Sequence, residues 1–300
     1  MNSMNEKLFH AGDVIFREGD TGSCFYQILD GVAGAYLDYG EPNQRKLTDM
    51  MPGQFFGEMA VIDACPRTTT VVAEKDLRVV EISEQNLNDY FSEKPEQILA
   101  IMKQLSSRIR SLTEEYEEVN LFLKEKQDEA APKKESFLSR MKKYADINRR
   151  AAKLSSLTAE DVIKEKADAV PAGSPLPVLS FPKGRIIFRE GDEGLYMYAV
   201  HGGSVGIYAG YCSVSEKKLT SLYSGTFFGE MGMIDNEKRS ATAVVEEDNT
   251  ILETIGADDL QNLFRTNPME INMILTHLSN RLRRLTVDYV KACEAAVKDN

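Results

Sequence analysis

Two long stretches of the chain place apolar residues in alternating steps of four and three, which is the rhythm of a helix that buries one face. The first row contains Ile98, Met102, Leu105, Ile109, Leu112, Tyr116, Val119 and Leu123. The second contains Ile271, Leu275, Leu278, Leu282, Leu285, Tyr289, Ala292 and Ala296. We therefore expect two long helices. They either pair with each other, inside one chain or in a homodimer, or pack on their own β-structure.

Short apolar runs precede each of these helical stretches. Val14–Phe16, Val71–Ala73 and Val79–Ile82 are rich in β-branched residues, and clusters of Gly, Asp, Asn and Pro separate them. Many short strands with turn signals between them are typical of a sandwich, jelly roll or barrel. The predicted fold is mainly β with α: two antiparallel, jelly-roll-like β-rolls, each followed by a long C-terminal helix.

An internal repeat organises the chain. Residues 16–20 recur at 188–192, and residues 55–59 recur at 227–231, with an offset of 172 in both cases. So many matches at one offset indicate a duplication. We predict a first domain at 1–120, a basic helical linker segment at 121–177 and a second domain at 178–300. The run Phe16–Asp20 is expected to form a strand and a turn and not a binding site.

The segment between the repeats has a different character. Helical spacing of Phe137, Met141, Tyr144 and Ile147 predicts a helix over 136–153. Thr158 with Asp161 is typical of a second helix start, and a Pro-rich run follows at 171–177. We interpret Lys142, Lys143, Arg149 and Arg150 as a solvated face; the alternative is a nucleic-acid or membrane surface.

Composition excludes several functions. The net charge of −11 argues against broad DNA binding. The first residues are mostly polar, and no run approaches the roughly 18 apolar residues of a membrane helix, so we expect a cytoplasmic protein with no membrane contact. The cysteines are scattered at Cys24, Cys65, Cys212 and Cys293, and we expect small buried apolar groups. The three histidines lie far apart, so we expect no metal, no cofactor and no enzymatic activity of the cupin type.

The repeated motif that carries chemistry joins a glycine, an acid and a base. Gly57 and Glu58 precede Arg67, and Gly229 and Glu230 precede Arg239, with a step of nine positions from Glu to Arg each time. A glycine allows close approach of a ligand to the backbone. A guanidinium offers forked donors to phosphate oxygens, and a carboxylate accepts a hydrogen bond from a sugar hydroxyl. The pattern suits a cyclic phosphate joined to ribose.

With these motifs, both repeats resemble the cyclic nucleotide-binding family, over roughly 8–119 and 178–292. The resemblance implies that Glu58 and Glu230 hold the ribose 2′-hydroxyl and that Arg67 and Arg239 hold the phosphate. It also implies help from backbone N–H groups near Met59, Ala60, Thr68, Met231, Gly232 and Ser240. Positions expected near the base are Thr113, Tyr116, Thr286 and Tyr289; the two tyrosines are alternatively residues of the helix seam.

The two copies of the motif differ after the arginine. The family usually has Ala at the second position, where Ala241 agrees and Thr69 does not. Thr68 is similar to the pattern of cGMP-dependent kinases, and Ser240 to that of a cAMP-binding activator. We expect a sensor of cAMP, with cGMP as the alternative, that couples binding to helix rearrangement and to an unknown protein partner. Alternatives are a transcription regulator that uses the middle segment and a scaffold with vestigial pockets.

Overall fold

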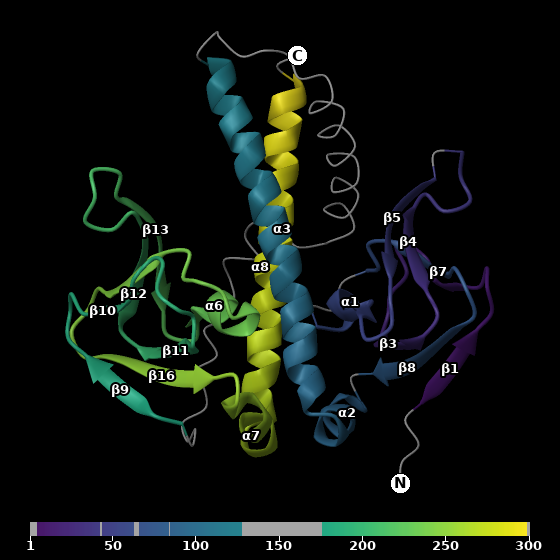
Figure 1. Ribbon diagram of the computed structural model, residues 1–300, viewed down its shortest axis with the longest axis horizontal. Helices are drawn as coiled ribbons and strands as arrows, with labels where there is room; N and C mark the ends of the chain where they lie inside the picture. The colour runs from purple at the N-terminus through teal and green to yellow at the C-terminus, as the bar shows by residue number, and fades with distance from the viewer. Residues whose placement is uncertain (1–4, 43, 63–65, 84, 128–175, 299–300) are drawn as a thin grey trace. The chain divides into compact units, whose positions relative to one another are not determined.

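The computed structural model describes residues 5–42, 44–62, 66–83, 85–127 and 176–298. Each repeat forms an antiparallel β-roll of two four-stranded sheets, and long helices follow the rolls (Figure 1). This arrangement confirms the fold class that the strand and helix patterns predict. The helices expected over 136–153 and from Thr158 lie outside the described residues, as does most of the Pro-rich run. The domain limits at 120 and 177 stay a prediction.

In the first β-roll, one sheet has the strand order β1-β8-β3-β6 and the other has β2-β7-β4-β5. Tyr26, Phe56 and Val79 from the first sheet pack with Ala33 and Val71 from the second, so the core lies between the sheets. The strands are β1 (Glu6–Phe9), β2 (Val14–Phe16), β3 (Cys24–Asp30), β4 (Ala33–Leu37), β5 (Arg45–Met50), β6 (Phe55–Phe56), β7 (Thr70–Ala73) and β8 (Leu77–Ser83).

The second β-roll repeats this topology, with the orders β9-β16-β11-β14 and β10-β15-β12-β13. Its core again takes residues from both sheets, Val200, Phe228 and Leu252 from one and Val205 and Ala243 from the other. The strands are β9 (Val178–Phe181), β10 (Ile186–Phe188), β11 (Tyr196–Gly202), β12 (Ser204–Ala209), β13 (Lys217–Tyr223), β14 (Phe227–Phe228), β15 (Thr242–Val245) and β16 (Thr250–Gly256).

Each roll contains one short helix after its sixth strand and two helices at its end. The described helices are α1 (Glu58–Ile62), α2 (Leu87–Glu93), α3 (Glu96–Gln127), α6 (Glu230–Asp235), α7 (Asp259–Thr266) and α8 (Pro268–Lys298). The two apolar rows of the sequence fall on α3 and α8, which confirms the prediction of two long helices.

The compact units of the chain do not follow chain order. The first unit joins the described residues of Met1–Tyr90 with α3 from Ser107 onward and α8 from Leu278 onward. The second unit joins Phe91–Ser106 with the described residues of Thr158–His277. Each long helix therefore contributes one part to each unit.

In the first unit, the later parts of α3 and α8 pack against each other. Val119 from α3 forms one buried cluster with Tyr289, Cys293 and Ala296 from α8, and these side chains are at most 2% exposed. Leu112, Tyr116, Phe122, Leu123 and Ala292 pack around them. Residues of the two apolar rows thus pack against each other within one chain.

The cysteines divide between buried and exposed positions. Cys293 is fully buried in the helix pair, as predicted. Cys24 is half-buried on β3, and Cys212 is exposed at a positive φ of 61° after β12. The prediction of burial is wrong for Cys212, because it lies in the connection between β12 and β13, where the chain turns outside the core. Cys65 lies outside the described residues.

A pair of buried carboxyl groups lies in the second unit. Glu253 on β16 and Glu270 on α8 are both fully buried. His201 Nε2 lies 2.7 Å from Glu253 Oε2, and Asn267 Nδ2 donates to Glu270 Oε2 at 2.9 Å. The other oxygen of each carboxyl group, Oε1, has no hydrogen-bond partner within the described part of the chain. Burial first, and then the neighbouring Glu253, raise the pKa of Glu270 to about 7.

This raised pKa predicts how stability varies with pH. The ordinary pKa of Glu270 is 4.5, so between about pH 4.5 and 7 the unfolded chain loses a proton that the folded chain keeps. The advantage of the protonated folded form is complete below pH 4.5 and is lost by about pH 7. Glu270→Gln should therefore raise the free energy of unfolding relative to the parent progressively across that window. Urea unfolding at pH 4.5, 6 and 8 measures the difference.

Asp288 provides the control for this prediction. It is an exposed carboxylate on the same helix, α8. Asp288→Asn should change stability by a similar small amount at each of these pH values. If Glu270→Gln also gives a constant difference from the parent between pH 4.5 and 8, the buried carboxyl group does not titrate in this range.

Candidate functional site

The short helices α1 and α6 begin directly after the glycines of the repeated motif. Gly57 has a φ of 79° and Gly229 a φ of 73°, a left-handed conformation that side chains rarely adopt. A Cβ at Gly57 would lie 2.5 Å from Arg67 Nη1, and one at Gly229 would lie 2.7 Å from Arg239 Nη1. The motif needs glycine here because the guanidinium lies directly against this backbone.

The two arginines are held in the same way in both repeats. Arg67 Nη1 donates to Gly57 O at 2.6 Å, and Arg239 Nη1 donates to Gly229 O at 2.5 Å. Their Nη2 groups donate to the first residues of β3 and β11, to Cys24 O and to Tyr196 O. The structure therefore brings together the glycine and the arginine of each motif, as the sequence predicts.

Aromatic rings complete the arginine sites. The guanidinium carbon of Arg67 lies 4.2 Å from the centre of the Phe16 ring, and that of Arg239 lies 4.2 Å from the Phe188 ring. These are cation–π contacts, which are stronger when the groups are shielded from water. The sequence predicts a strand at these phenylalanines but not the stacking. The only sign of this contact in the sequence is that both phenylalanines begin the repeated run, 16–20 and 188–192.

Both arginine Nε groups are buried and lack a hydrogen-bond partner in the described residues. The side chains of Arg67 and Arg239 are themselves only 4% and 6% exposed. Burial lowers the pKa of Arg239, while Tyr198 and Glu230 act in the opposite direction. A buried N–H donor without a partner costs about 1–3 kcal/mol. Each arginine thus retains an unused donor. We call the motif glycine, the short helix after it and the arginine the cassette.

The turn after β2 holds the backbone of the arginine. Gly19 N donates to Arg67 O at 2.8 Å, and Arg67 N donates to Asp20 O at 2.8 Å. In the second repeat, Gly191 and Asp192 make the same two bonds with Arg239, at 2.9 and 2.8 Å. This confirms that the run is a strand and a turn. Its position beside the arginine explains why both runs recur together.

The carboxylate of the motif is buried in both repeats. Glu58 and Glu230 are the first residues of α1 and α6 and are 2% and 1% exposed. Glu58 Oε1 accepts a hydrogen bond from Arg108 Nη1 at 2.6 Å, and Arg108 is half-exposed on α3. Arg108 balances the charge of a carboxylate that would otherwise be costly to bury. The sequence does not reveal this partner, since nothing in the pattern of α3 links residue 108 to Glu58.

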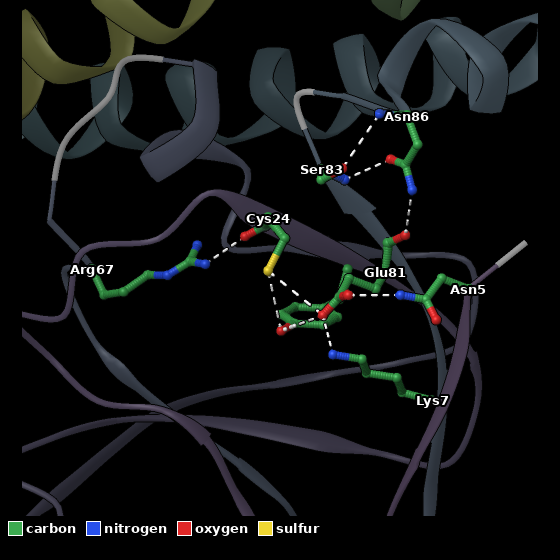
Figure 2. A network of polar contacts seen from close by, with 8 residues as sticks. Asn5, Lys7, Cys24, Arg67, Glu81, Ser83 and Asn86 are labelled. Carbon is green, nitrogen blue, oxygen red and sulfur yellow. Dashed lines mark hydrogen bonds and ion pairs between the residues drawn. The ribbon is translucent and has the colours of Figure 1, made fainter.

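Figure 2 shows the polar network that surrounds the Cys24 end of this arrangement. The Cys24 thiol lies 3.3 Å from the Tyr26 hydroxyl, and that hydroxyl donates to Glu81 Oε2 at 3.2 Å. Asn5 and Lys7 also donate to Glu81. Burial, with Cys24 and Glu81 nearby, raises the pKa of Tyr26 above its usual range. The network ties β1, β3 and β8 together at the strand end that accepts from Arg67.

The residues expected near a nucleotide base lie on the two long helices. Thr113 Oγ1 donates to Ile109 O and Thr286 Oγ1 to Leu282 O, both one turn earlier in the same helix. Tyr116 and Tyr289 lie in the helix-pair cluster. Burial raises the pKa of Tyr289 above its usual range. The tyrosines are therefore seam residues, and a contact of any of the four with a base stays a prediction.

The remaining predicted residues lie on the short helices or directly after the arginines. Met59 and Met231 are the second residues of α1 and α6, followed by Ala60 and Gly232, which are buried. Gly232 lies against Gly194, where a Cβ would be 2.4 Å from the Gly232 carbonyl carbon. Thr68 is half-buried and Ser240 is exposed, each directly after its arginine. The structure does not place a ligand on these atoms, so their roles stay predictions.

Within the described ranges, none of the helices is long and apolar enough to cross a membrane. Over the same residues, no group of three or more His, Cys, Asp or Glu side chains is arranged to hold a metal ion.

Comparison with known proteins gives a match to the cyclic nucleotide-binding domain at residues 6–94 and 178–267. The cAMP-dependent protein kinase regulatory subunit of Dictyostelium discoideum is 26% identical over 244 residues, covering 80% of this chain and 59% of the relative. The cGMP-dependent protein kinase of Plasmodium berghei is 22% identical over 246 residues, covering 82% and 22%. A solved regulatory domain of Toxoplasma gondii PKA with cAMP is 20% identical, covers 89% and 85%, and has a TM-score of 0.27. The chain spans about half the length of the curated regulatory subunits it matches.

Proposed function

Because the chain belongs to the cyclic nucleotide-binding domain family, which matches both repeats, we propose that it is a cyclic-nucleotide receptor with one pocket in each repeat. The observation that carries the proposal is the duplicated arginine site. Arg67 and Arg239 are buried, held by a glycine carbonyl and a phenylalanine ring, and each keeps a buried Nε without a partner in the described residues. The unused donor is suited to a phosphate oxygen, since a charge-assisted hydrogen bond removes the cost of leaving it unpaired.

Glu58 and Glu230 are proposed to take the ribose. A buried carboxylate accepts a hydrogen bond from a 2′-hydroxyl without competition from water, and both carboxylates begin the cassette helices. Arg108 supports this role in the first repeat, because it balances the Glu58 charge. The ligand is then a ribose cyclic phosphate, with cAMP as the first expectation and cGMP as the second.

We infer a binding function and not a catalytic one. The match to the cGMP-dependent kinase covers 22% of that protein. The regulatory subunits give a wider match. A receptor of this kind acts by favouring one helix arrangement over another, which requires that the ligand contact the two arrangements differently. The proposed readout is a protein partner that senses α3 and α8.

Displacement of a fluorescent cAMP analogue from the full chain tests this function. cAMP or cGMP should displace the analogue, and linear 5′-AMP should not, since it has the same base and ribose without the cyclic phosphate. Equal displacement by 5′-AMP would mean that the site does not distinguish a cyclic phosphate from a linear one. Failure of the analogue and of both cyclic nucleotides to bind would contradict the proposal.

Selectivity between the pockets gives a finer prediction. If Thr68 contributes a hydroxyl contact to guanine, Thr68→Ala should weaken cGMP binding in the first pocket by several-fold and spare cAMP, because one such contact contributes about 1 kcal/mol. Ser240→Ala, at the same position after Arg239, is the matched control and should not change cGMP binding in the first pocket. Competition titrations in an Arg239→Ala background isolate that pocket. Equal losses for both nucleotides would assign Thr68 to the phosphate instead.

A further inference from the structure

Two buried serines on the long helices contact the cassette helices. Ser106 on α3 and Ser279 on α8 are both fully buried and occupy equivalent positions, 173 residues apart. Within the second unit, Ser106 Oγ donates to Asp235 Oδ2 at 2.7 Å and lies 3.1 Å from Met231 Sδ. Within the first unit, Ser279 Oγ lies 3.1 Å from Met59 Sδ.

These contacts are crossed between the repeats. Ser106 belongs to the helix that follows the first repeat, but it contacts α6 of the second. Ser279 belongs to the helix that follows the second repeat, but it contacts α1 of the first. Each cassette helix is therefore held by a residue from the other repeat. Neither the repeat nor the heptad rhythm predicts this exchange.

The contact of Ser106 reaches both ends of α6. Met231 is the second residue of this six-residue helix and Asp235 is its last, and Glu230 begins it. A hydrogen bond to an ionised carboxylate is about twice as strong as one between neutral groups. Loss of this hydrogen bond would therefore loosen the helix that places Glu230. Since Glu230 is the proposed ribose contact, its position determines the affinity of the second pocket.

The same turn of α3 also serves the first pocket. Arg108, two residues after Ser106, donates to Glu58. Side chains two residues apart on a helix do not face the same side. Two side chains from one turn of α3 thus contact different repeats. Ser106 contacts the cassette of the second repeat, and Arg108 contacts the cassette of the first.

We propose that Ser106 is a positioning residue for the nucleotide pocket of the second repeat and Ser279 for that of the first, so that each pocket depends on the other repeat's helix. This inference rests on the proposed function.

The test uses the full chain with one pocket disabled at a time. Arg67→Ala leaves the second pocket to bind cAMP, and Arg239→Ala leaves the first. Adding Ser106→Ala should weaken cAMP binding about fivefold to tenfold in the Arg67→Ala chain, which is less than the full effect of a charge-assisted hydrogen bond because Ser106 acts on the pocket only through α6. In the Arg239→Ala chain, the same substitution should change cAMP affinity by no more than about twofold, because substitutions at sites without shared contacts act independently. Ser279→Ala should weaken cAMP binding in the Arg239→Ala chain by a smaller factor, because its contact is with a thioether, a weak acceptor, and should leave the Arg67→Ala chain within about twofold.

Ser107→Ala is the matched control, because Ser107 is the exposed neighbour of Ser106 on the same helix; it should leave both pockets unchanged. A second variant, Asp235→Asn, keeps the size of the acceptor and removes its charge. It should weaken the second pocket in the same direction even if Ser106→Ala folds poorly.

Equal weakening of both pockets by Ser106→Ala would overturn the proposal, since the serine would then only stabilise the fold. So would an effect of Ser107→Ala as large as that of Ser106→Ala. Absence of cAMP and cGMP binding by the parent chain is a separate result, which would overturn the proposed function and this inference with it.

Discussion

Arg239→Ala is expected to weaken cAMP binding in the second pocket by about 2–4 kcal/mol, because it removes a partly desolvated, charge-assisted contact with the phosphate. The structure adds a second reason. Arg239 also joins Gly229 O to Tyr196 O and stacks on Phe188, so its loss loosens the cassette itself. Competition with a fluorescent cAMP analogue in the full chain, with Arg67→Ala as background, measures the loss.

Two variants separate these effects from general damage. Arg239→Lys keeps the charge but loses the forked donors, so its affinity should lie between those of the parent and of Arg239→Ala. Arg185→Ala removes an exposed arginine of the same repeat and should leave binding unchanged. If Arg239→Ala binds cAMP as tightly as the parent while the folded state is retained, the arginine does not hold the phosphate.

Val119→Asp is expected to lower the free energy of unfolding by roughly 3 kcal/mol or more, because it places an unpaired charge among Tyr289, Cys293 and Ala296. Val119 is 1% exposed. The long helices contribute to both compact units, so loss of their pairing should be felt by the whole chain. Urea unfolding followed by circular dichroism measures the change.

Leu121→Asp is the control for this helix-pair prediction. Leu121 lies two residues further along α3 and is 60% exposed. An exposed substitution away from special contacts changes stability by about 0.5 kcal/mol or less. Similar stability of Val119→Asp and Leu121→Asp would mean that α3 and α8 do not pair in this way in solution.

The sequence predicts the structure of this protein well wherever a repeat or a periodicity is compatible with one structure only. The offset of 172 predicts two copies of one β-roll, and the four–three rhythm predicts α3 and α8. The recurrence of Gly57 and Arg67 at Gly229 and Arg239 predicts which residues lie together. In each case the residues that meet are close in sequence or related by the repeat.

The contacts that the sequence does not predict join the two copies. The rows on α3 and α8 share one register, so the pattern is equally satisfied by several pairings, and nothing in it links Ser106 to Asp235. Arg108 gives no sign of its contact with Glu58, since charged residues are common beside a heptad seam. Glu253 and Glu270 are buried although acidic residues are rarely found in a core. Only the folded arrangement shows that they lie close together, with His201 beside Glu253.

Calorimetric titration of the full chain with cAMP is the most direct test of the central claim that each repeat holds a nucleotide. The parent chain should bind two cAMP molecules, and Arg67→Ala and Arg239→Ala should each bind one with the parent's affinity at the remaining site. Binding of a single molecule that survives both substitutions, or no binding of cAMP or cGMP at all, would contradict it.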